Sequence, residues 1–203
     1  MGSQCCGRLR SLAVRQQGAV AVEAALIIPL LIVLVFGIIE FGLLIRDYVA
    51  VTAATRSAAR VASAEPRAAG FDTDAREAAL HAMSSLPIGD LREVWVYRAN
   101  ADGFPGTDAG GSFANCTASI DCVRFSYAPE TQTWTAVGGF DYHKVVACQG
   151  AADATSVGVY IRADHQSLTR LIFDSVGMAE HAVMRFEPMP TVNGLAGGNC
   201  RPT

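Results

Sequence analysis

Apolar residues are concentrated in one continuous run near the N-terminus. Between residues 24 and 45 the chain carries a single charge, Glu40, while Leu, Ile and Val occupy every side of a helical projection. About 22 residues of helix, at a rise of about 1.5 Å each, span roughly 33 Å, which is enough to cross a bilayer core of roughly 30 Å. We therefore predict a transmembrane helix rather than the core helix of a soluble domain, and a membrane helix tolerates Pro29.

The helical pattern continues beyond the apolar run. Residues 46–64 are rich in Ala, and no Gly or Pro interrupts them before Pro66. A single helix over residues 19–64 is therefore predicted, with a length of about 69 Å. The small residues in its second half permit close packing against other helices or against a head domain.

The C-terminal two thirds of the chain predict a mixed head. A short helix is predicted for residues 73–86, with Asp72 or Thr73 as its cap and Pro87 at its end. Later segments alternate apolar and polar residues as half-buried strands do. These segments are residues 91–97, 122–127, 133–137, 157–163 and 182–187. We expect an α+β fold, in which an antiparallel sheet of about four or five strands and the short helix pack on the long N-terminal helix.

Basic residues precede the apolar run, and no acidic residue occurs before Glu23. These basic residues are Arg8, Arg10 and Arg15. The positive-inside rule then places the N-terminus in the cytoplasm and the head outside the cell membrane. A cleaved secretory signal is the competing interpretation, but its apolar region is normally about 7–15 residues long. The predicted parts are a leader, a transmembrane segment, a helical continuation and an exported head, at residues 1–18, 19–45, 46–66 and 67–203.

Composition narrows the classes of function. The 203 residues suffice for one ordinary domain, and 51% of them are hydrophobic while only 17% are charged. This balance excludes an intrinsically disordered chain. A net charge of −3 without a basic block argues against nucleic acid as a partner. Membrane lipid is the partner that the apolar run implies.

The cysteines fit an exported head. Two of the six lie in the leader, and the other four lie in the part expected outside the membrane. An even number in an exported domain favours disulfide bonds. We favour one bond between Cys116 and Cys122 and another between Cys148 and Cys200. A zinc site is the alternative, but the spacing of these cysteines does not match common ligand patterns.

The sequence contains no motif for catalysis or for a cofactor. It lacks a nucleophile elbow, a phosphate-binding loop, a zinc-protease pair and a dinucleotide fingerprint. His165 lies near Asp164 and Ser167, but neighbours along a strand point to opposite faces. A glycine-rich loop contains Asp102 and Asp108 without the ligand spacing of a calcium site. We therefore predict no enzyme, no cofactor and no metal site, and keep a membrane-tethered exported enzyme as the weaker alternative.

The residues just ahead of the apolar run form a processing pattern. Gly18 follows a basic, polar leader, and Glu23 follows Gly18 after four apolar residues. A carboxylate at the start of a span is costly unless it is paired or hydrated, which makes it a candidate for function. This is the substrate pattern of prepilin peptidases, which would cleave between Gly18 and Ala19. Glu23 would then neutralise the new amino group of a neighbouring subunit; the simpler interpretation is that Glu23 stabilises the helix N-terminus.

Glu40 is the one charge inside the apolar run. It lies about seventeen residues beyond Glu23, or roughly 25 Å along a helix, near the expected outer interface of the membrane. Either it pairs with Arg46 or with another subunit, or it is a solvated residue of the interface. The sequence leaves both possibilities open.

Residues 15–60 resemble the N-terminal region of TadE-like proteins, the minor pseudopilins of tight-adherence (Flp-type) pilus systems. The matching features are Gly18, Glu23, the Pro-Leu-Leu step at 29–31 and the Phe-Gly-Ile-Ile-Glu-Phe-Gly block at 36–42. The resemblance implies a structural subunit that helps to assemble a pilus, with adhesion or secretion as the downstream role. It also implies a prepilin peptidase, a major pilin, a second pseudopilin, an inner-membrane platform and an assembly ATPase as partners.

Two further interpretations remain. A pseudopilin of type II secretion has a similar leader, but it usually has Phe directly after the cleaved Gly, where this chain has Ala19. The other is an uncleaved single-pass membrane protein whose exported head binds an envelope or extracellular partner. It predicts that Gly18 and Glu23 are replaceable without consequence.

Overall fold

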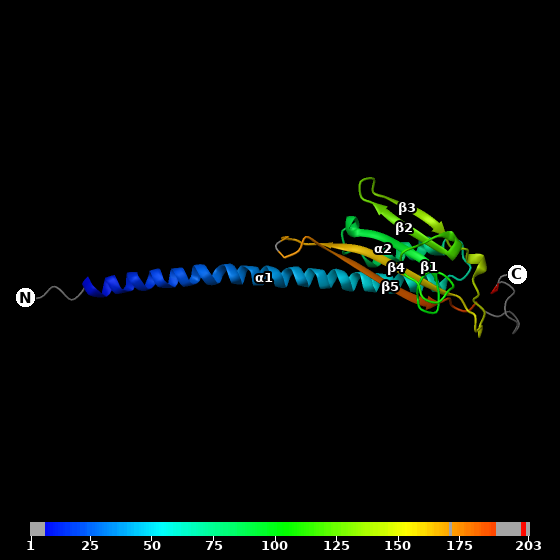
Figure 1. Ribbon diagram of the computed structural model, residues 1–203, viewed down its shortest axis with the longest axis horizontal. Coiled ribbons are helices and arrows are strands. Elements are labelled where there is room, and N and C mark those ends of the chain that lie inside the picture. Colours follow the sequence, from blue (N-terminus) through cyan, green and yellow to red (C-terminus); the bar gives the residue numbers. More distant parts are fainter. Residues whose placement is uncertain (1–6, 171, 190–199, 202–203) are drawn as a thin grey trace, which may run out of the picture.

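The computed structural model of the protein describes residues 7–170, 172–189 and 200–201, with side chains from residue 18 onward. A single helix, α1 (Gly7–Ala64), projects far beyond a compact head (Figure 1). Its 58 residues correspond to about 87 Å at the usual helical rise. The helix ends at Ala64, as the sequence predicts, but it already begins at Gly7 and so includes most of the expected leader.

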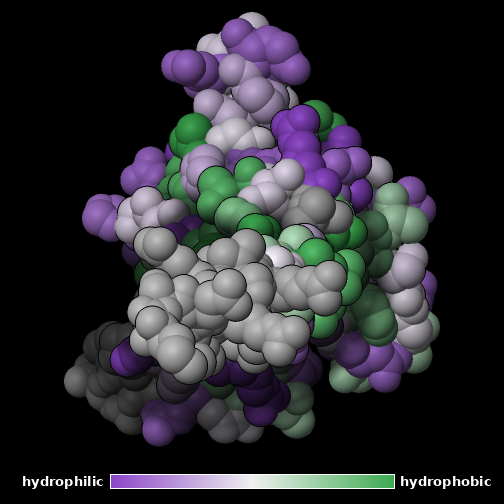
Figure 2. All heavy atoms as spheres, turned by 90° about the vertical axis from the view of Figure 1, so that its left-hand side faces the viewer, coloured by the Kyte–Doolittle hydropathy of each residue, from purple (hydrophilic) through white to green (hydrophobic). Residues whose placement is uncertain are grey.

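The first half of α1 stands clear of the head. Within the described residues, the Gly18–Ala64 part of α1 is the one helix long and apolar enough to cross a membrane, and its most apolar stretch is not buried by the rest of the chain. Seen along the axis of α1, hydrophobic side chains gather around the helix while hydrophilic ones occupy the outer parts of the head (Figure 2). This helix indicates a single-pass membrane protein.

The head contains a five-stranded antiparallel sheet in the order β3-β2-β1-β4-β5. Its strands are β1 (Leu91–Ala99), β2 (Cys122–Ala128), β3 (Thr133–Gly139), β4 (Ser156–Gln166) and β5 (Ser175–Arg185). Short 3-10 turns lie before β1 at Ile88–Asp90, between β1 and β2 at Ala118–Ile120, and between β3 and β4 at Tyr142–Lys144. The α+β class and the antiparallel sheet that the sequence predicts are confirmed.

One face of the sheet packs on the helices, and the other packs on a loop. Val94 and Val96 of β1 belong to a core that also includes the Ala-rich second half of α1. The alternate residues Trp95 and Tyr97 belong to a second cluster on the opposite face, where Phe113 of the 100–121 loop covers them. The alternating side chains of β1 are therefore buried on both faces of the sheet. A shift by one residue would exchange the two sets, so this burial fixes the register of the strand.

The short helix α2 (Phe71–Ala82) differs at both ends from the prediction of residues 73–86. Gly70 is its N-cap with φ 88°, and no side chain caps the helix, so the prediction of Asp72 or Thr73 as cap is wrong. The helix starts early because Phe71 is buried in the core, edge-on to Phe140 and Phe186. Because glycine adopts a left-handed backbone conformation without steric cost, Gly suits position 70.

The last two strands form a hairpin that is much longer than the sequence predicts. β4 continues to Gln166 instead of ending at 163, and β5 begins at Ser175 instead of 182. All eleven residues of β4 pair with β5, from Ser156 opposite Arg185 to Gln166 opposite Ser175. The hairpin runs along α1 toward its N-terminal half (Figure 1), so it brings Ile172 and Phe173 against the apolar part of the helix.

Candidate functional site

The predicted processing residues lie on one uninterrupted, exposed stretch of α1. Gly18 is helical and exposed, and a Cβ built on it would meet no atom within 4 Å. Packing against the side chains that the structure describes therefore gives no reason for glycine at position 18. Glu23 is exposed as well, and no hydrogen bond or ion pair joins it to any other residue that the structure describes. Both residues are thus available to a partner outside the chain.

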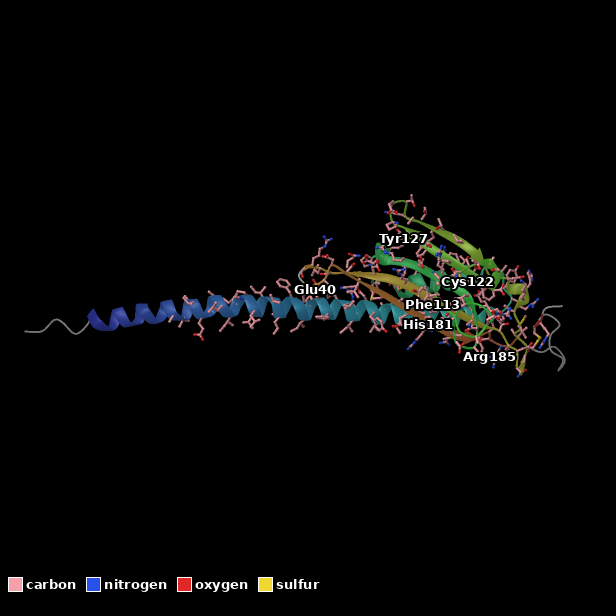
Figure 3. All side chains as sticks on the ribbon, in the orientation of Figure 1. Glu40, Phe113, Cys122, Tyr127, His181 and Arg185 are labelled. Carbon is pink, nitrogen blue, oxygen red and sulfur yellow. A yellow bond between two sulfur atoms is a disulfide. The ribbon has the colours of Figure 1, made fainter. Side chains whose placement is uncertain are left out.

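Glu40 has a set of partners that the sequence did not reveal. The tip of the β4–β5 hairpin encloses its carboxylate, and the residue has no exposed surface (Figure 3). Its oxygens accept hydrogen bonds from Ser167 Oγ at 3.1 Å, from the backbone N–H of Leu168 at 3.1 Å and from Thr169. Thr169 donates twice, from its backbone N–H at 2.6 Å and from Oγ1 at 2.7 Å. Four donors are enough to satisfy a carboxylate removed from water.

The expected partner of Glu40, Arg46, binds elsewhere. Its guanidinium donates to Asp47 Oδ1 from Nε at 2.9 Å and from Nη2 at 2.8 Å. The other oxygen of Asp47 lies 2.7 Å from Nδ1 of His165, near the end of β4. Asp47 and His165 are both buried, so the pair lies inside the contact between α1 and the hairpin. Glu40 is therefore neither paired with Arg46 nor solvated in this chain.

The two buried carboxylates occupy the same side of α1. Asp47 follows Glu40 by seven residues, which is about two helical turns. Val51, about one turn further along the same side of α1, belongs to the hydrophobic core of the head. Beside it, the hydroxyl of Tyr48 donates to Glu180 of β5. The hairpin is thus fixed to α1 by polar contacts at several heights along the helix.

Two disulfide bonds brace the head at its far end from the apolar helix. They are Cys116–Cys122 and Cys148–Cys200, which are the pairs favoured from the sequence. Cys122 lies at the start of β2, directly under the aromatic cluster on the outer face of the sheet. The second bond joins segments that are 52 residues apart, near the described end of the chain.

The glycine-rich loop is organised by its own side chains. Asn100 Nδ2 donates to the carbonyls of Asp108 and Gly110 at 2.5 and 2.6 Å, and Asn100 Oδ1 accepts from two backbone N–H groups. Asp102 accepts from the N–H of Gly110 at 2.5 Å. Burial raises the pKa of Tyr97, whose hydroxyl donates to this loop at the carbonyl of Gly103. These bonds account for Asn100 and Asp102 in the loop.

The residues considered for catalysis do not meet. Asp164 binds Arg92 at 2.8 Å, His165 binds Asp47, and Ser167 binds Glu40. Within the described part of the chain, no group of three or more His, Cys, Asp or Glu side chains is placed to hold a metal ion. The contacts of His165 and Ser167 instead attach the β4–β5 hairpin to α1.

Sequence reasoning missed this attachment because its partners lie more than 100 residues apart. A usable signal was present on α1, where Glu40 and Asp47 share one side of an otherwise apolar and Ala-rich helix. Two carboxylates on one helical face require donors from elsewhere in the fold. The hydroxyl pair Ser167 and Thr169 and the adjacent His165 are candidate donors, but only the hairpin geometry brings them to α1.

Comparisons with known proteins agree with the N-terminal resemblance. The family described as TadE-like protein matches residues 18–60, so the similarity begins at the predicted processing glycine and ends within α1. The match indicates a role in tight-adherence pilus systems. The comparisons with curated proteins and with solved structures gave no match.

Proposed function

We propose that this protein is a minor pseudopilin that takes part in the assembly of a tight-adherence pilus and is processed by a prepilin peptidase after Gly18. The observation that carries the proposal is the family match over residues 18–60, which starts at that glycine. The exposed, unbraced helix that follows supports it, since pilin-type subunits assemble through such a helix. The role is structural, and the head orients or regulates contacts outside the membrane.

Processing would turn α1 into an assembly element. Cleavage after Gly18 removes all the leader arginines and leaves a new amino group on Ala19. Glu23 has no partner among the described residues, so its carboxylate is free to neutralise that amino group on a neighbouring subunit. An unpaired charge in an apolar helical bundle costs several kcal/mol, so this pairing would set the axial register between subunits.

The test is the mass and N-terminal sequence of the membrane-bound protein, produced with and without a prepilin peptidase. We expect a mature chain that starts at Ala19, and an intact chain when Gly18 is replaced by Val. Gly42→Val is the matched control, because a Cβ on Gly42 of the same helix also meets no atom within 4 Å. An intact wild-type chain in the presence of the peptidase would instead favour the uncleaved single-pass protein whose head binds a partner.

A further inference from the structure

The tip of the β4–β5 hairpin lies beside the apolar run of α1. A Cβ built on Gly37 would lie 3.4 Å from Cδ1 of Ile172, and the ring of Phe173 packs edge-on to Phe41 with centroids 6.0 Å apart. Arg46 is the first charged residue after Glu40. Measured back from Arg46 along the helix, Gly37 is about 13 Å deep and Glu40 about 9 Å deep. The tip therefore reaches the level of the predicted membrane span.

Backbone at such a depth needs internal hydrogen bonds, because the hydrocarbon core offers no water to irregular structure. The tip meets that requirement at four successive N–H groups. Those of Leu168 and Thr169 donate to Glu40. The N–H of Arg170 donates to Ser167 Oγ at 2.8 Å, and the N–H of Ser167 donates to the carbonyl of Asp174 at 3.0 Å. Glu40 thus satisfies two backbone donors of the tip, and the same hydrogen bonds replace the water that its carboxylate would otherwise need.

The side chains that the tip turns outward include large apolar ones. Leu168 is 70% exposed and Ile172 is 45% exposed. The hydroxyls of Ser167 and Thr169 are bonded inward to Glu40, while Asp174 at the end of the tip is exposed. Leu168 and Ile172 continue the exposed apolar surface of α1, where Ile38 is 67% exposed at the same height. A long Arg170 side chain, also exposed, can extend toward lipid phosphates while its stem stays in the apolar layer.

We propose that the tip of the β4–β5 hairpin, of which the structure describes residues 167–170 and 172–174, is immersed in the outer leaflet of the membrane and contacts acyl chains through Leu168 and Ile172. The occupant of this surface is lipid, because Ile172 and Phe173 of the tip contact the apolar run of α1 itself, at Gly37 and Phe41. The inference rests on the membrane span and not on the pilus role. The head is then attached to the membrane through both α1 and the hairpin tip. These two attachments fix its tilt and rotation relative to the bilayer.

The experiment measures the depth of single spin labels on the full chain in lipid vesicles. The background carries Cys5→Ser and Cys6→Ser, and labelling is done without reductant so that the disulfide bonds stay intact. Labels are placed by Leu168→Cys or Ile172→Cys at the tip, by Ile38→Cys in the span and by Val137→Cys on β3. Val137 is the matched control, since it is 51% exposed and lies in the edge strand β3.

Collisions of each label with oxygen, which dissolves in lipid, are compared with collisions with a water-soluble nickel chelate. We expect the labels at 168 and 172 to lose accessibility to nickel and to gain it to oxygen, as the label at 38 does, while the label at 137 shows the reverse. Tip labels that behave like the one at 137 would overturn the proposal. Tip labels shielded from both reagents would overturn it too, because a protein would then cover the tip. If the label at 38 is itself in water, the span is wrong and the proposal falls with it, whereas the peptidase test above is read independently.

Discussion

Asp47 Oδ2 lies 2.7 Å from Nδ1 of His165, and this contact joins α1 to the end of β4 inside a buried interface. His165 Nε2 is buried and has no hydrogen-bond partner among the described residues. A neutral ring that donates from Nδ1 leaves only a lone pair unsatisfied, whereas a doubly protonated ring would leave a bare N–H. The arrangement therefore favours the tautomer in which Nδ1–H of His165 donates to Oδ2 of Asp47.

Replacing His165 by Ala removes one donor from a buried carboxylate that keeps Arg46 as its other partner. We expect the free energy of unfolding of the head to fall by about 1–3 kcal/mol, the usual cost of leaving a buried polar group without its partner. Thermal unfolding of the full chain in detergent measures the change. His181→Ala is the control, because that histidine is exposed on β5.

A double variant distinguishes the hydrogen bond between Asp47 and His165 from the packing of each side chain. If the bond matters, Asp47→Asn combined with His165→Ala should cost less than the sum of the single changes, since each removes the same interaction. Strictly additive losses would show that the contact contributes nothing beyond the packing of each side chain.

Glu40→Gln tests the attachment of the hairpin tip. The N–H of Leu168 donates to Oε2 and that of Thr169 to Oε1, so an amide keeps one acceptor but turns its N–H₂ group toward the other backbone donor. We expect the backbone amides at 168 and 169 to exchange with solvent hydrogen roughly tenfold faster, as for a lost hydrogen bond. Mass spectrometry of peptides covering 160–180 measures the rate.

Peptides from β1 serve as the internal control in that experiment, since β1 is the central strand and its pairing with β4 ends at Ala163, short of the tip. Faster exchange confined to the tip supports a local attachment. Unchanged exchange at the tip would mean that apolar contacts, such as Phe41 with Phe173, hold the hairpin without the carboxylate.

The sequence predicts the parts of this fold that depend on local pattern. The apolar run, the end of the helix at Ala64 and the starts of β1, β2 and β3 follow from periodicity and from turn residues. The start of β5 does not, because residues 175–181 contain few strongly β-forming residues and become a strand by pairing with β4. The Glu40 contacts were likewise not predictable, since they exist only once that hairpin has formed.

Gly158 of β4 faces the ring of Tyr97 on β1, and a Cβ at this position would overlap the ring. Because Tyr97 is fully buried under the loop that contains Phe113, the ring cannot turn away without breaking the cluster. We expect Gly158→Ala to destabilise the head by about 3 kcal/mol, as overpacking of a rigid core does. Chemical denaturation measures the loss.

Gly177→Ala is the matched control for that variant. It lies in the neighbouring strand β5, and its new Cβ would meet only the carboxylate of Asp164 at an ordinary 3.6 Å. Equal stability losses at 158 and 177 would point to a general effect of removing strand glycines and against the specific contact with Tyr97.

Glu65 follows the end of α1 and lies near Asp74 in the first turn of α2. Burial raises the pKa of Glu65, and the nearby carboxylate of Asp74 raises this pKa further. Because the folded-state pKa is above the unfolded one, the charged form opposes folding at pH values above the unfolded pKa of about 4.3, and this penalty disappears below it. Glu65→Gln should therefore raise the thermal midpoint at pH 7, and the gain should vanish as the pH falls toward 4. Glu130→Gln, an exposed control, should show no such dependence, and a lower midpoint for Glu65→Gln at pH 7 would contradict this account of the penalty.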